Sequence, residues 1–447
     1  MVFERILIAN RGEIALRVIR ACKELGIQTV AVYSDADKDS LHVTLADSAI
    51  HIGPALSSKS YLNQEAILDA IRQSGADAVH PGYGFLSENA GFAKACQDLG
   101  VTFIGPSAES ISRAGDKSSA RKALMTLGIP VIPGSDDVII SVDMACEVAK
   151  DVGFPVILKA SGGGGGRGMR IANNEAELVQ AFDMASGEAR AAFGNPDIYL
   201  EKYIENPRHI EIQVIGDTHG NIIYLGEREC SIQMRYQKLI EEAPSSFVDD
   251  ELRQELGQTA VKIARAIDYH NAGTMEFLVD REKNFYFMEV NARVQVEHPV
   301  TEAITGIDIV QEQIFIAAGA RLDIQQEDVR LNGWSIECRI NASDPDDNFM
   351  PSPGVIESVI FPGGPGVRLD THIHDQYMVT PYYDSLVGKL IVWAKDRPAA
   401  IERMNRALEE FDIKGIATTI PFFREVLNHP DFRTGEIDTH FIDRFFS

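Results

Sequence analysis

The sequence PVILKASGGGGGRGMR, residues 155–170, places five consecutive glycines between two apolar stretches. Glycine lets backbone amides approach an anion closely, and the flanking Lys159 and Arg167 add positive charge. The run matches neither the dinucleotide fingerprint, which needs a helix directly after it, nor a P-loop, which needs Lys-Ser/Thr. Because Met169–Ala172 indicates a second strand, we predict a hairpin whose tip closes over phosphate groups. The alternative is an ordinary flexible linker.

The composition is that of a multidomain protein with a strongly acidic balance. The chain has 447 residues. Since a domain takes roughly 150 residues, this length is enough for three domains. A formal net charge of −24 argues against nucleic acid or an anionic membrane as a partner. The five cysteines are scattered without a C-x-x-C pair, and no signal peptide or membrane-length apolar run is present. We therefore expect reduced thiols and a cytoplasmic protein.

The first part of the chain alternates strands with helices. Arg5–Ala9, Thr29–Tyr33 and Ala78–His80 indicate strands, and Glu13–Leu25 and Gln64–Ser74 carry apolar residues at helical spacing. This alternation is typical of a parallel sheet covered on both faces. We predict a mixed α/β and α+β fold of three domains: a Rossmann-like domain at 1–114, a second domain at 115–330 with a lid at about 131–203, and a β-rich domain at 331–447.

Two apolar stretches, residues 273–279 and 284–291, flank a polar turn and indicate an antiparallel hairpin. A two-residue turn at 282–283 would place Glu276 opposite Glu289, with Asn291 on the same face. Opposed carboxylates repel by about 3 kcal/mol at an effective dielectric constant near 20, and a divalent cation would reverse this repulsion. The oxygen-only set suits magnesium. The alternative is a solvated acidic face.

Polar residues continue at every second position after this hairpin: Glu289, Asn291, Arg293, Gln295 and Glu297. We predict that the strand continues through them and presents them on one face. A guanidinium at 293 suits a planar oxyanion, and a carboxylate at 297 is placed to remove a proton from it. A surface strand would show the same alternation.

Several motifs together resemble a known family. They are Lys159–Ser161 with the glycines, EKYIENPRHIE at 201–211, residues 289–302, RGEIA at 11–15 and HPGYGFLSEN at 80–89. Together they resemble the ATP-grasp enzymes and, more narrowly, biotin carboxylase, the ATP-dependent component of biotin-dependent carboxylases. The resemblance covers essentially the whole chain and implies an ATP-grasp fold and a ligase.

The resemblance also implies roles for individual residues. The phosphates of ATP, with Mg²⁺ or Mn²⁺, would be held by Lys117, Lys159, Gly165 and Gly166, and the metal by Glu276, Glu289 and Asn291. The rest of the nucleotide would contact Glu201, Lys202, Tyr203, Ile204, His209, Gln233 and Tyr236. Bicarbonate would bind Lys238, Arg293, Gln295, Val296, Glu297 and Arg339, and biotin would bind Arg339 and Tyr83. Glu297 would deprotonate bicarbonate, which attacks the γ-phosphate to form carboxyphosphate, and Arg339 would stabilise the biotin enolate-like oxygen.

The resemblance implies partners as well, and the sequence departs from the family at two positions. No Met-Lys-Met motif is present, so we expect the biotin carboxyl carrier protein and the carboxyltransferase on separate chains, and a homodimer. The favoured assembly is acetyl-CoA carboxylase of fatty acid synthesis. A pyruvate or propionyl-CoA carboxylase, another ATP-grasp carboxylate–amine ligase, and an inactive nucleotide-binding scaffold stay open. Met234 and Tyr236 stand where the family commonly has a basic residue and a histidine, which predicts altered nucleotide affinity.

Overall fold

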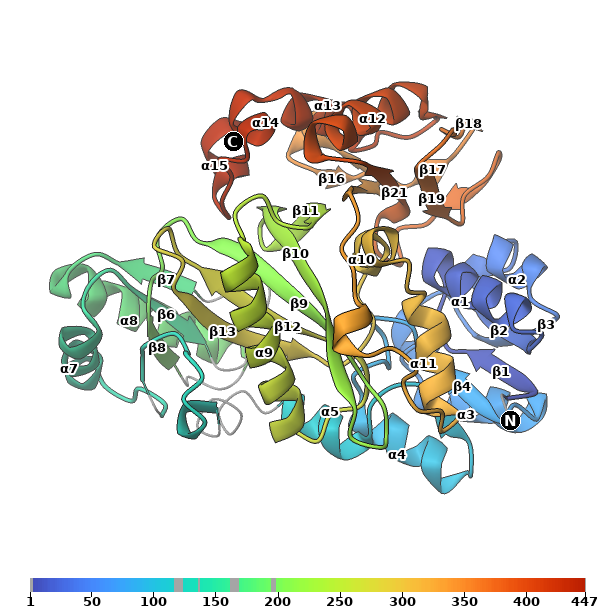
Figure 1. The fold of residues 1–447 in the computed structure, drawn as a ribbon, viewed down its shortest axis with the longest axis horizontal. Coiled ribbons are helices and arrows are strands. Elements are labelled where there is room, and N and C mark those ends of the chain that lie inside the picture. Colours follow the sequence, from blue (N-terminus) through green and yellow to red (C-terminus); the bar gives the residue numbers. More distant parts are fainter. Residues whose placement is uncertain (1–2, 116–123, 136, 161–168, 194–197, 447) are drawn as a thin grey trace.

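The computed structural model describes residues 3–115, 124–135, 137–160, 169–193 and 198–446. The glycine run at 162–166 and the predicted phosphate ligands Lys117, Gly165 and Gly166 lie outside these ranges. Figure 1 shows the amino-terminal part, a small sheet with two helices, a long central sheet and the carboxy-terminal helices as distinct regions around a common centre.

The amino-terminal part is a five-stranded parallel sheet in the order β3-β2-β1-β4-β5. Its strands are β1 (Arg5–Ile8), β2 (Gln28–Ser34), β3 (Ser48–Gly53), β4 (Ala78–His80) and β5 (Thr102–Phe103), and its helices are α1 (Gly12–Glu24), α2 (Leu41–Leu45), α3 (Gln64–Ser74), α4 (Ala90–Asp98) and α5 (Ala108–Gly115). The parallel sheet is confirmed. Sequence analysis missed β3, an edge strand that is mostly half-buried or exposed and lacks a continuous apolar run.

The loops after β1 and β4 are joined at the carboxyl edge of this sheet. Asn10 donates hydrogen bonds from its Nδ2 to the carbonyl oxygens of Pro81, at 2.7 Å, and Tyr83, at 2.8 Å. Gly12 begins α1 with a φ of +68°, which favours glycine at this turn. The two loops therefore form one wall of the cavity described below.

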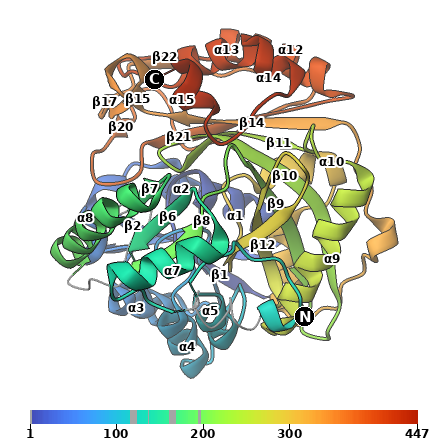
Figure 2. The same cartoon turned by 90° about the vertical axis from the view of Figure 1, so that its left-hand side faces the viewer.

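A three-stranded antiparallel sheet with two helices forms the lid region (Figure 2). It contains α7 (Val142–Val152), β6 (Val156–Ala160), β7 (Met169–Ala172), α8 (Glu175–Phe193) and β8 (Ile198–Lys202). Lys159 pairs with Met169, so the two strands that flank the glycine run form the predicted hairpin. Asn174 accepts a hydrogen bond from the Glu177 amide, which caps the N-terminus of α8.

The central sheet has eight strands in the order β13-β12-β9-β10-β11-β14-β21-β19. They are β9 (Arg208–Gly216), β10 (Ile222–Met234), β11 (Gln237–Ala243), β12 (Asn271–Val279), β13 (Phe285–Asn291), β14 (Trp334–Asn341), β19 (Val367–Thr371) and β21 (Leu386–Ala394). Helix α9 (Asp250–Ala266) packs on β9 and β10. Because β11 pairs with β14, the sheet runs without interruption across residue 330, where the third domain is expected to begin. The domain limits stay predictions.

The remaining helices are α10 (His298–Thr305), α11 (Ile309–Ala317), α12 (Arg397–Glu410), α13 (Ile420–Asn428), α14 (Pro430–Thr434) and α15 (Phe441–Phe446). The remaining strands are β15 (Ser343–Asp344), β16 (Met350–Pro351), β17 (Gly354–Val355), β18 (Ser358–Ile360), β20 (Met378–Val379) and β22 (Asp412–Lys414). The neighbouring strands β17 and β18 pair with different partners, β17 with β20 and β18 with β22.

The β12–β13 hairpin has the predicted pairing for a reason that the sequence did not reveal. Glu276 lies opposite Glu289, and Thr274 lies opposite Asn291. The predicted two-residue turn is wrong, because Asp280 and Asn284 close a three-residue loop in which Lys283 has a φ of +67°. A β-bulge, with Met288 as the extra residue, then shifts the register by one and brings the two glutamates opposite each other.

The aromatic underside of this hairpin should be a major contributor to stability. Phe277 is fully buried, and its ring lies 5.7 Å from that of Phe285 and 6.1 Å from that of Phe287, both edge to face. We expect Phe277→Ala to lower the free energy of unfolding by about 3–5 kcal/mol, because it removes contacts and leaves a cavity. Urea denaturation followed by tryptophan fluorescence would measure this. Phe361→Ala, at a side chain that is 43% exposed, is the control and should cost less than half as much.

Candidate active site

A cavity of about 1520 Å³ lies where the amino-terminal sheet, the lid region, the central sheet and the carboxy-terminal helices meet. All of the predicted site residues within the described ranges line it. They are Tyr83, Lys159, Glu201, Lys202, Tyr203, Ile204, His209, Gln233, Tyr236, Lys238, Glu276, Glu289, Asn291, Arg293, Gln295, Val296, Glu297 and Arg339. The fold therefore gathers residues from strands and loops that lie far apart in the chain.

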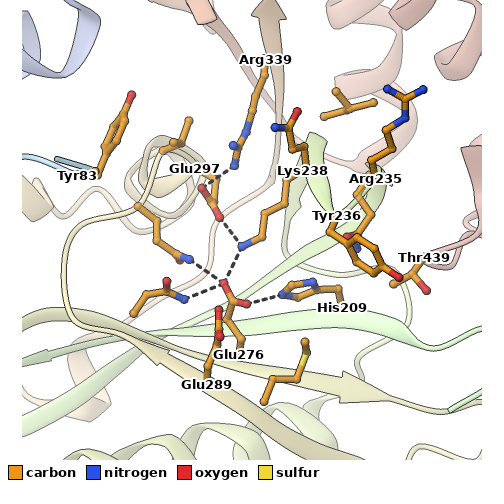
Figure 3. A pocket seen from close by; sticks show the side chains of 18 of the residues that line it. Tyr83, His209, Arg235, Tyr236, Lys238, Glu276, Glu289, Glu297, Arg339 and Thr439 are labelled. Atoms are coloured by element: carbon orange, nitrogen blue, oxygen red, sulfur yellow. Dashed lines mark hydrogen bonds and ion pairs between the residues drawn. The ribbon is translucent and has the colours of Figure 1, made fainter. Parts of the chain in front are cut away.

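Lys238, on β11, lies at the centre of this cavity (Figure 3). Its Nζ is 2.8 Å from Glu276 Oε1 and 2.7 Å from Glu297 Oε1, and it also donates to Glu211. Burial lowers the pKa of the ammonium group, but the three carboxylates outweigh this effect and hold the pKa of Lys238 well above its usual value. Lys238 is therefore a permanent cation that three acidic residues share.

Glu297 lies between two cations. Its second oxygen accepts a hydrogen bond from Arg339 Nη2 at 2.8 Å, and the Arg339 Nε donates to Glu241 at 2.6 Å. Burial alone would raise the pKa of Glu297, but Lys238 and Arg339 hold it well below its usual value. The carboxylate is ionised, and its affinity for a proton would increase if a ligand drew either cation away.

Glu276 accepts hydrogen bonds at both of its carboxylate oxygens. Its Oε1 accepts from Asn291 Nδ2 and from Gln295 Nε2, both at 2.9 Å, and its Oε2 lies 3.0 Å from His209 Nε2. Burial raises its pKa, but Lys238 and His209 lower it well below the usual value. The resemblance placed His209 near the nucleotide, and here it contacts a predicted metal ligand.

The hairpin supplies the donor set that a hard divalent cation prefers. Glu276 and Glu289 are cross-strand neighbours, and Asn291 follows on the same strand as Glu289. Two carboxylates and an amide oxygen suit Mg²⁺, which completes its octahedron with water and phosphate oxygens. The residues present therefore fit the metal that the resemblance implies.

Several of the predicted nucleotide residues lie on the lid strands β6 and β8 or directly after them. Lys159 Nζ lies 2.5 Å from Glu201 Oε2, and Lys202 Nζ donates to the carbonyl oxygen of Phe154 at 2.7 Å. The Tyr203 hydroxyl is 2.8 Å from His440 Nε2, which brings the carboxy-terminal region to the lid. Lys159 and Glu201, both predicted nucleotide ligands, are thus paired with each other.

Tyr236 lies at the tip of the β10–β11 hairpin. Met234 pairs with Gln237, and Arg235 and Tyr236 form the two-residue turn with φ values of +49° and +65°. The Tyr236 side chain is 62% exposed at the mouth of the cavity. Figure 3 shows its ring beside Thr439, away from the Lys238 cluster. A different residue at position 236 would therefore alter the edge of the nucleotide region and leave the contacts of Lys238 unchanged.

The predicted continuation of the strand through Glu297 is wrong. β13 ends at Asn291, and the following residues form a loop that leads to α10, for which Glu297 is the N-cap residue. The amide of Ala292 donates to Glu88 Oε1 at 2.9 Å instead of to a neighbouring strand, which ends the pairing. Arg293 Nε then binds Glu88 Oε2 at 3.0 Å. Gln295 and Glu297 still reach Glu276 and Lys238, but by the path of this loop.

Tyr83 contributes to the wall opposite the nucleotide region. Its hydroxyl donates to Glu13, on α1, and both residues line the cavity together with Arg339. Burial and the adjacent Glu13 raise the pKa of Tyr83 well above its usual value, so its hydroxyl stays protonated. The two predicted biotin ligands thus share one cavity.

The sequence analysis missed two buried cations that support the site. Arg228, fully buried on β10, donates to Glu211 and, at 2.6 Å, to Gln295 Oε1. Lys389, fully buried on β21, donates to the Val296 carbonyl oxygen at 2.8 Å and lies 3.2 Å from Glu13 Oε2. Lys389 stands in an otherwise apolar strand, and a charged residue in such a strand is the signal that could have identified it. Arg228 lies between Glu227 and Glu229 on a strand of mixed polarity, which gives no such signal.

Three family models match consecutive parts of the chain. Residues 2–111 match the biotin carboxylase N-terminal domain, residues 116–325 match the carbamoyl-phosphate synthase L chain ATP binding domain, and residues 337–444 match the biotin carboxylase C-terminal domain. Biotin carboxylase 1 of Bacillus subtilis is 54% identical over 99% of this chain and 98% of its own length. A pyruvate carboxylase component of Methanothermobacter thermautotrophicus is 51% identical over 99% of this chain and 90% of its own length.

Solved structures agree with these matches. The biotin carboxylase domain dimer of Hydrogenobacter thermophilus 2-oxoglutarate carboxylase, in complex with MgADP, ADP and bicarbonate, has a TM-score of 0.93 and 53% identity, covering 99% of this chain and 98% of that one. A Campylobacter jejuni biotin carboxylase–nucleotide complex has a TM-score of 0.95 and 51% identity, covering 99% of both chains. Fold and site thus define a ligase of the ATP-grasp class. The chain belongs to the biotin carboxylase family.

No helix of the described residues is both long and apolar enough to cross a membrane. The five cysteines are all free and buried.

The shared ammonium group of Lys238 should dominate the stability of the site. We expect Lys238→Met to lower the free energy of unfolding near neutral pH by about 3–5 kcal/mol, because it removes the buried cation that three buried carboxylates share. Urea denaturation would measure the loss. Lys283→Met, which removes an ion pair between two largely exposed side chains, is the matched control and should cost only a small fraction as much.

The difference in the free energy of unfolding between wild type and Lys238→Met should also become smaller as the pH falls. In the native protein the pKa values of Glu276 and Glu297 are lowered, so their stabilising contribution exists above the usual glutamate pKa and is lost as pH falls. Without the ammonium group, burial would raise both pKa values, and the variant would gain stability as pH falls. A difference between the two proteins that stays constant from neutral to mildly acid pH would contradict this account.

Proposed function

We propose that this chain catalyses the ATP- and bicarbonate-dependent carboxylation of biotin on a carrier protein. The observation that carries the proposal is the convergence of Lys238, Arg339 and Glu297 beside the acidic hairpin within one cavity. Two cations next to an ionised carboxylate provide a binding place for an oxyanion and an acceptor for its proton. The hairpin carboxylates lie within reach of the same point, as the ion pair of Lys238 with Glu276 indicates.

The nucleotide occupies the lid side of the cavity in this proposal. Lys159 leaves Glu201 and binds the phosphates together with Lys117, Gly165 and Gly166, and Glu201–Ile204 contact the adenine with Gln233 and Tyr236. His209 keeps Glu276 oriented. Glu276, Glu289 and Asn291 hold Mg²⁺ or Mn²⁺, which neutralises phosphate charge when bound.

Bicarbonate binds beside the hairpin. Arg293, Gln295, Lys238 and the Val296 amide hold its oxygens, and Glu297 removes its proton so that it attacks the γ-phosphate of ATP to give carboxyphosphate, with ADP as the leaving group. Bicarbonate draws Lys238 away from Glu297, which raises the proton affinity of this base at the moment when it is needed. Arg228 and Lys389 position the loop through Gln295 and Val296.

Carboxyphosphate then decomposes to carbon dioxide and phosphate in the closed cavity. Phosphate accepts the proton from the biotin ureido nitrogen, and Arg339 stabilises the negative charge that develops on the ureido oxygen. The deprotonated nitrogen then attacks carbon dioxide to give carboxybiotin. Tyr83 contacts the biotin from the opposite wall. Closure of the lid limits the access of water to the intermediate.

The carrier and the carboxyltransferase are separate chains in this proposal, and the chain is a homodimer like the Hydrogenobacter thermophilus domain. We propose acetyl-CoA carboxylase as the assembly and the cytoplasm as its place, which suits five unpaired thiols. Pyruvate carboxylase is the second candidate, because a component of one such enzyme is 51% identical to this chain. Co-purification of the carrier and carboxyltransferase, followed by an assay with each acyl acceptor, would distinguish them.

Removal of the base tests the chemistry. We expect Glu297→Gln to lower biotin-dependent ATP hydrolysis and the formation of carboxybiotin from labelled bicarbonate by about 10²–10⁴-fold, since the amide cannot accept the proton. ATP affinity, measured by calorimetry, should change little. Glu255→Gln, at an exposed position of α9, is the control and should keep wild-type turnover. Hydrolysis that does not require bicarbonate would favour another ATP-grasp ligase, and tight ATP binding with zero turnover would favour an inactive scaffold.

The departure at position 236 predicts altered nucleotide affinity with intact chemistry. Tyr236→His should change the KM for ATP several-fold while kcat stays within about twofold, because the side chain lies at the cavity edge, away from Glu297. Steady-state kinetics at saturating bicarbonate and biotin would measure both constants. An unchanged KM for ATP would contradict a contact between Tyr236 and the nucleotide.

A further inference from the structure

Two carboxylates face each other across adjacent strands behind Arg339. Glu241 on β11 and Glu337 on β14 are direct antiparallel partners, and both side chains are fully buried. Residues opposed in this way have Cβ atoms about 5 Å apart. Arg339 follows Glu337 by two residues on β14, so it lies on the same face of the sheet. The pair is therefore part of the support behind the active-site arginine.

The hydrogen bonds of this pair are incomplete if both groups are carboxylates. Glu241 Oε1 accepts from Arg339 Nε at 2.6 Å. Glu241 Oε2 and both oxygens of Glu337 are buried without a hydrogen-bond partner among the described residues. Buried polar atoms without partners are costly, and unpaired buried charge costs more. A proton on Glu337 would remove its charge. The resulting O–H group could donate a hydrogen bond to the opposed Glu241 oxygen.

The surrounding charges explain why Glu337 is the protonated member. The cations nearest to it are engaged elsewhere: Arg339 with Glu241 and Glu297, Lys389 with Glu13 and the Val296 carbonyl oxygen, and Lys238 with three other glutamates. Helix α10, which packs on β14, adds the Glu297 carboxylate and His298, whose pKa burial lowers well below the usual value. Burial and the neighbouring Glu241 hold the pKa of Glu337 well above the usual value despite Lys389, and burial raises that of Glu241 to about 7.

We propose that Glu241 and Glu337 hold one proton between them and that this pair, with a single negative charge, positions Arg339 for the reaction. Two buried carboxyl groups that share one proton are a known arrangement when like charges lie close together. The positioning of Arg339 during turnover rests on the proposed function, because that function gives Arg339 its role. The existence of the shared proton does not depend on the proposed function.

The net charge of the Glu241–Glu337 pair determines how the guanidinium of Arg339 is held. With one negative charge behind it, the guanidinium is anchored through Nε and presents Nη2 to Glu297 and to the substrate. Loss of the shared proton would place a second negative charge behind the guanidinium, draw it toward β11 and β14, and repel an anionic substrate. Glu241 and Glu337 are positioning residues, since they act through Arg339.

Infrared difference spectroscopy tests the shared proton directly. A protonated carboxyl group has a C=O stretching band that is separate from the carboxylate bands. We expect the unliganded protein at neutral pH to show such a band, to lose intensity there as pH rises, and to lack that component in Glu337→Gln. Glu255→Gln, at an exposed carboxyl, is the control and should keep the full band. An identical protonated-carboxyl band in wild type and Glu337→Gln would overturn the proposal.

A second variant covers the case in which Glu337→Gln does not fold. Glu241→Gln removes the negative neighbour and leaves Arg339 free to pair with Glu337. The protonated-carboxyl band of Glu337 should then disappear at lower pH than in the wild type. A band that titrates as in the wild type would contradict the shared proton, since it would mean that Glu241 does not influence Glu337.

Kinetics tests the consequence for Arg339. We expect kcat/KM for bicarbonate in the wild type to fall at alkaline pH by about tenfold per pH unit, and Glu337→Gln to shift this loss upward by at least one unit, because a glutamine cannot lose the proton. A merely structural role would lower activity equally at every pH, and an unshifted alkaline limb would overturn the positioning role. A wild type without bicarbonate-dependent hydrolysis would contradict the proposed function, and the infrared result would still decide whether the pair holds a proton.

Discussion

The site depends on one buried ammonium group. Lys238 joins Glu211 of β9, Glu276 of β12 and the Glu297 carboxylate at the start of α10, so it holds three separately positioned elements at one point. Three carboxylates at this distance would repel one another strongly in a low-dielectric interior, and the cation reverses the sign of the interaction. The same ammonium group is what an incoming oxyanion would meet, so the interaction that holds these three elements together is also the one that a substrate would replace.

Further buried cations connect the regions of the chain to this centre. Arg228 fixes Gln295 from the face of the sheet that also carries Glu211 and Glu276, and Lys389 joins the loop at Val296 to Glu13 of the amino-terminal part. Because β14 and β21 extend the central sheet, the carboxy-terminal region contributes Arg339 and Lys389 from strands and not from flexible connections. Groups on such strands hold their geometry more tightly than groups on loops.

Particular residues show how far the sequence could be interpreted. The parallel amino-terminal sheet, the strands that flank the glycine run and the opposition of Glu276 and Glu289 were all predicted correctly. The last of these was correct through two compensating features, a three-residue loop and a bulge at Met288, which local patterns do not reveal. The path of residues 292–297 was predicted wrongly, because the Ala292 amide binds Glu88, a residue far earlier in the chain whose proximity no local pattern encodes.

The sequence by itself determined the alternation of elements, which follows from periodicity, and its motifs carried the resemblance that implied the family and the residue types that the chemistry requires. Only the tertiary structure decided which charges meet: that Lys238 is shared by three glutamates, that Arg339 joins Glu297 to Glu241, and that Glu337 has no cation left to pair with among the residues described. The physical reason is that pKa values and ion pairs depend on distance and burial, and both arise from contacts between strands far apart in the chain.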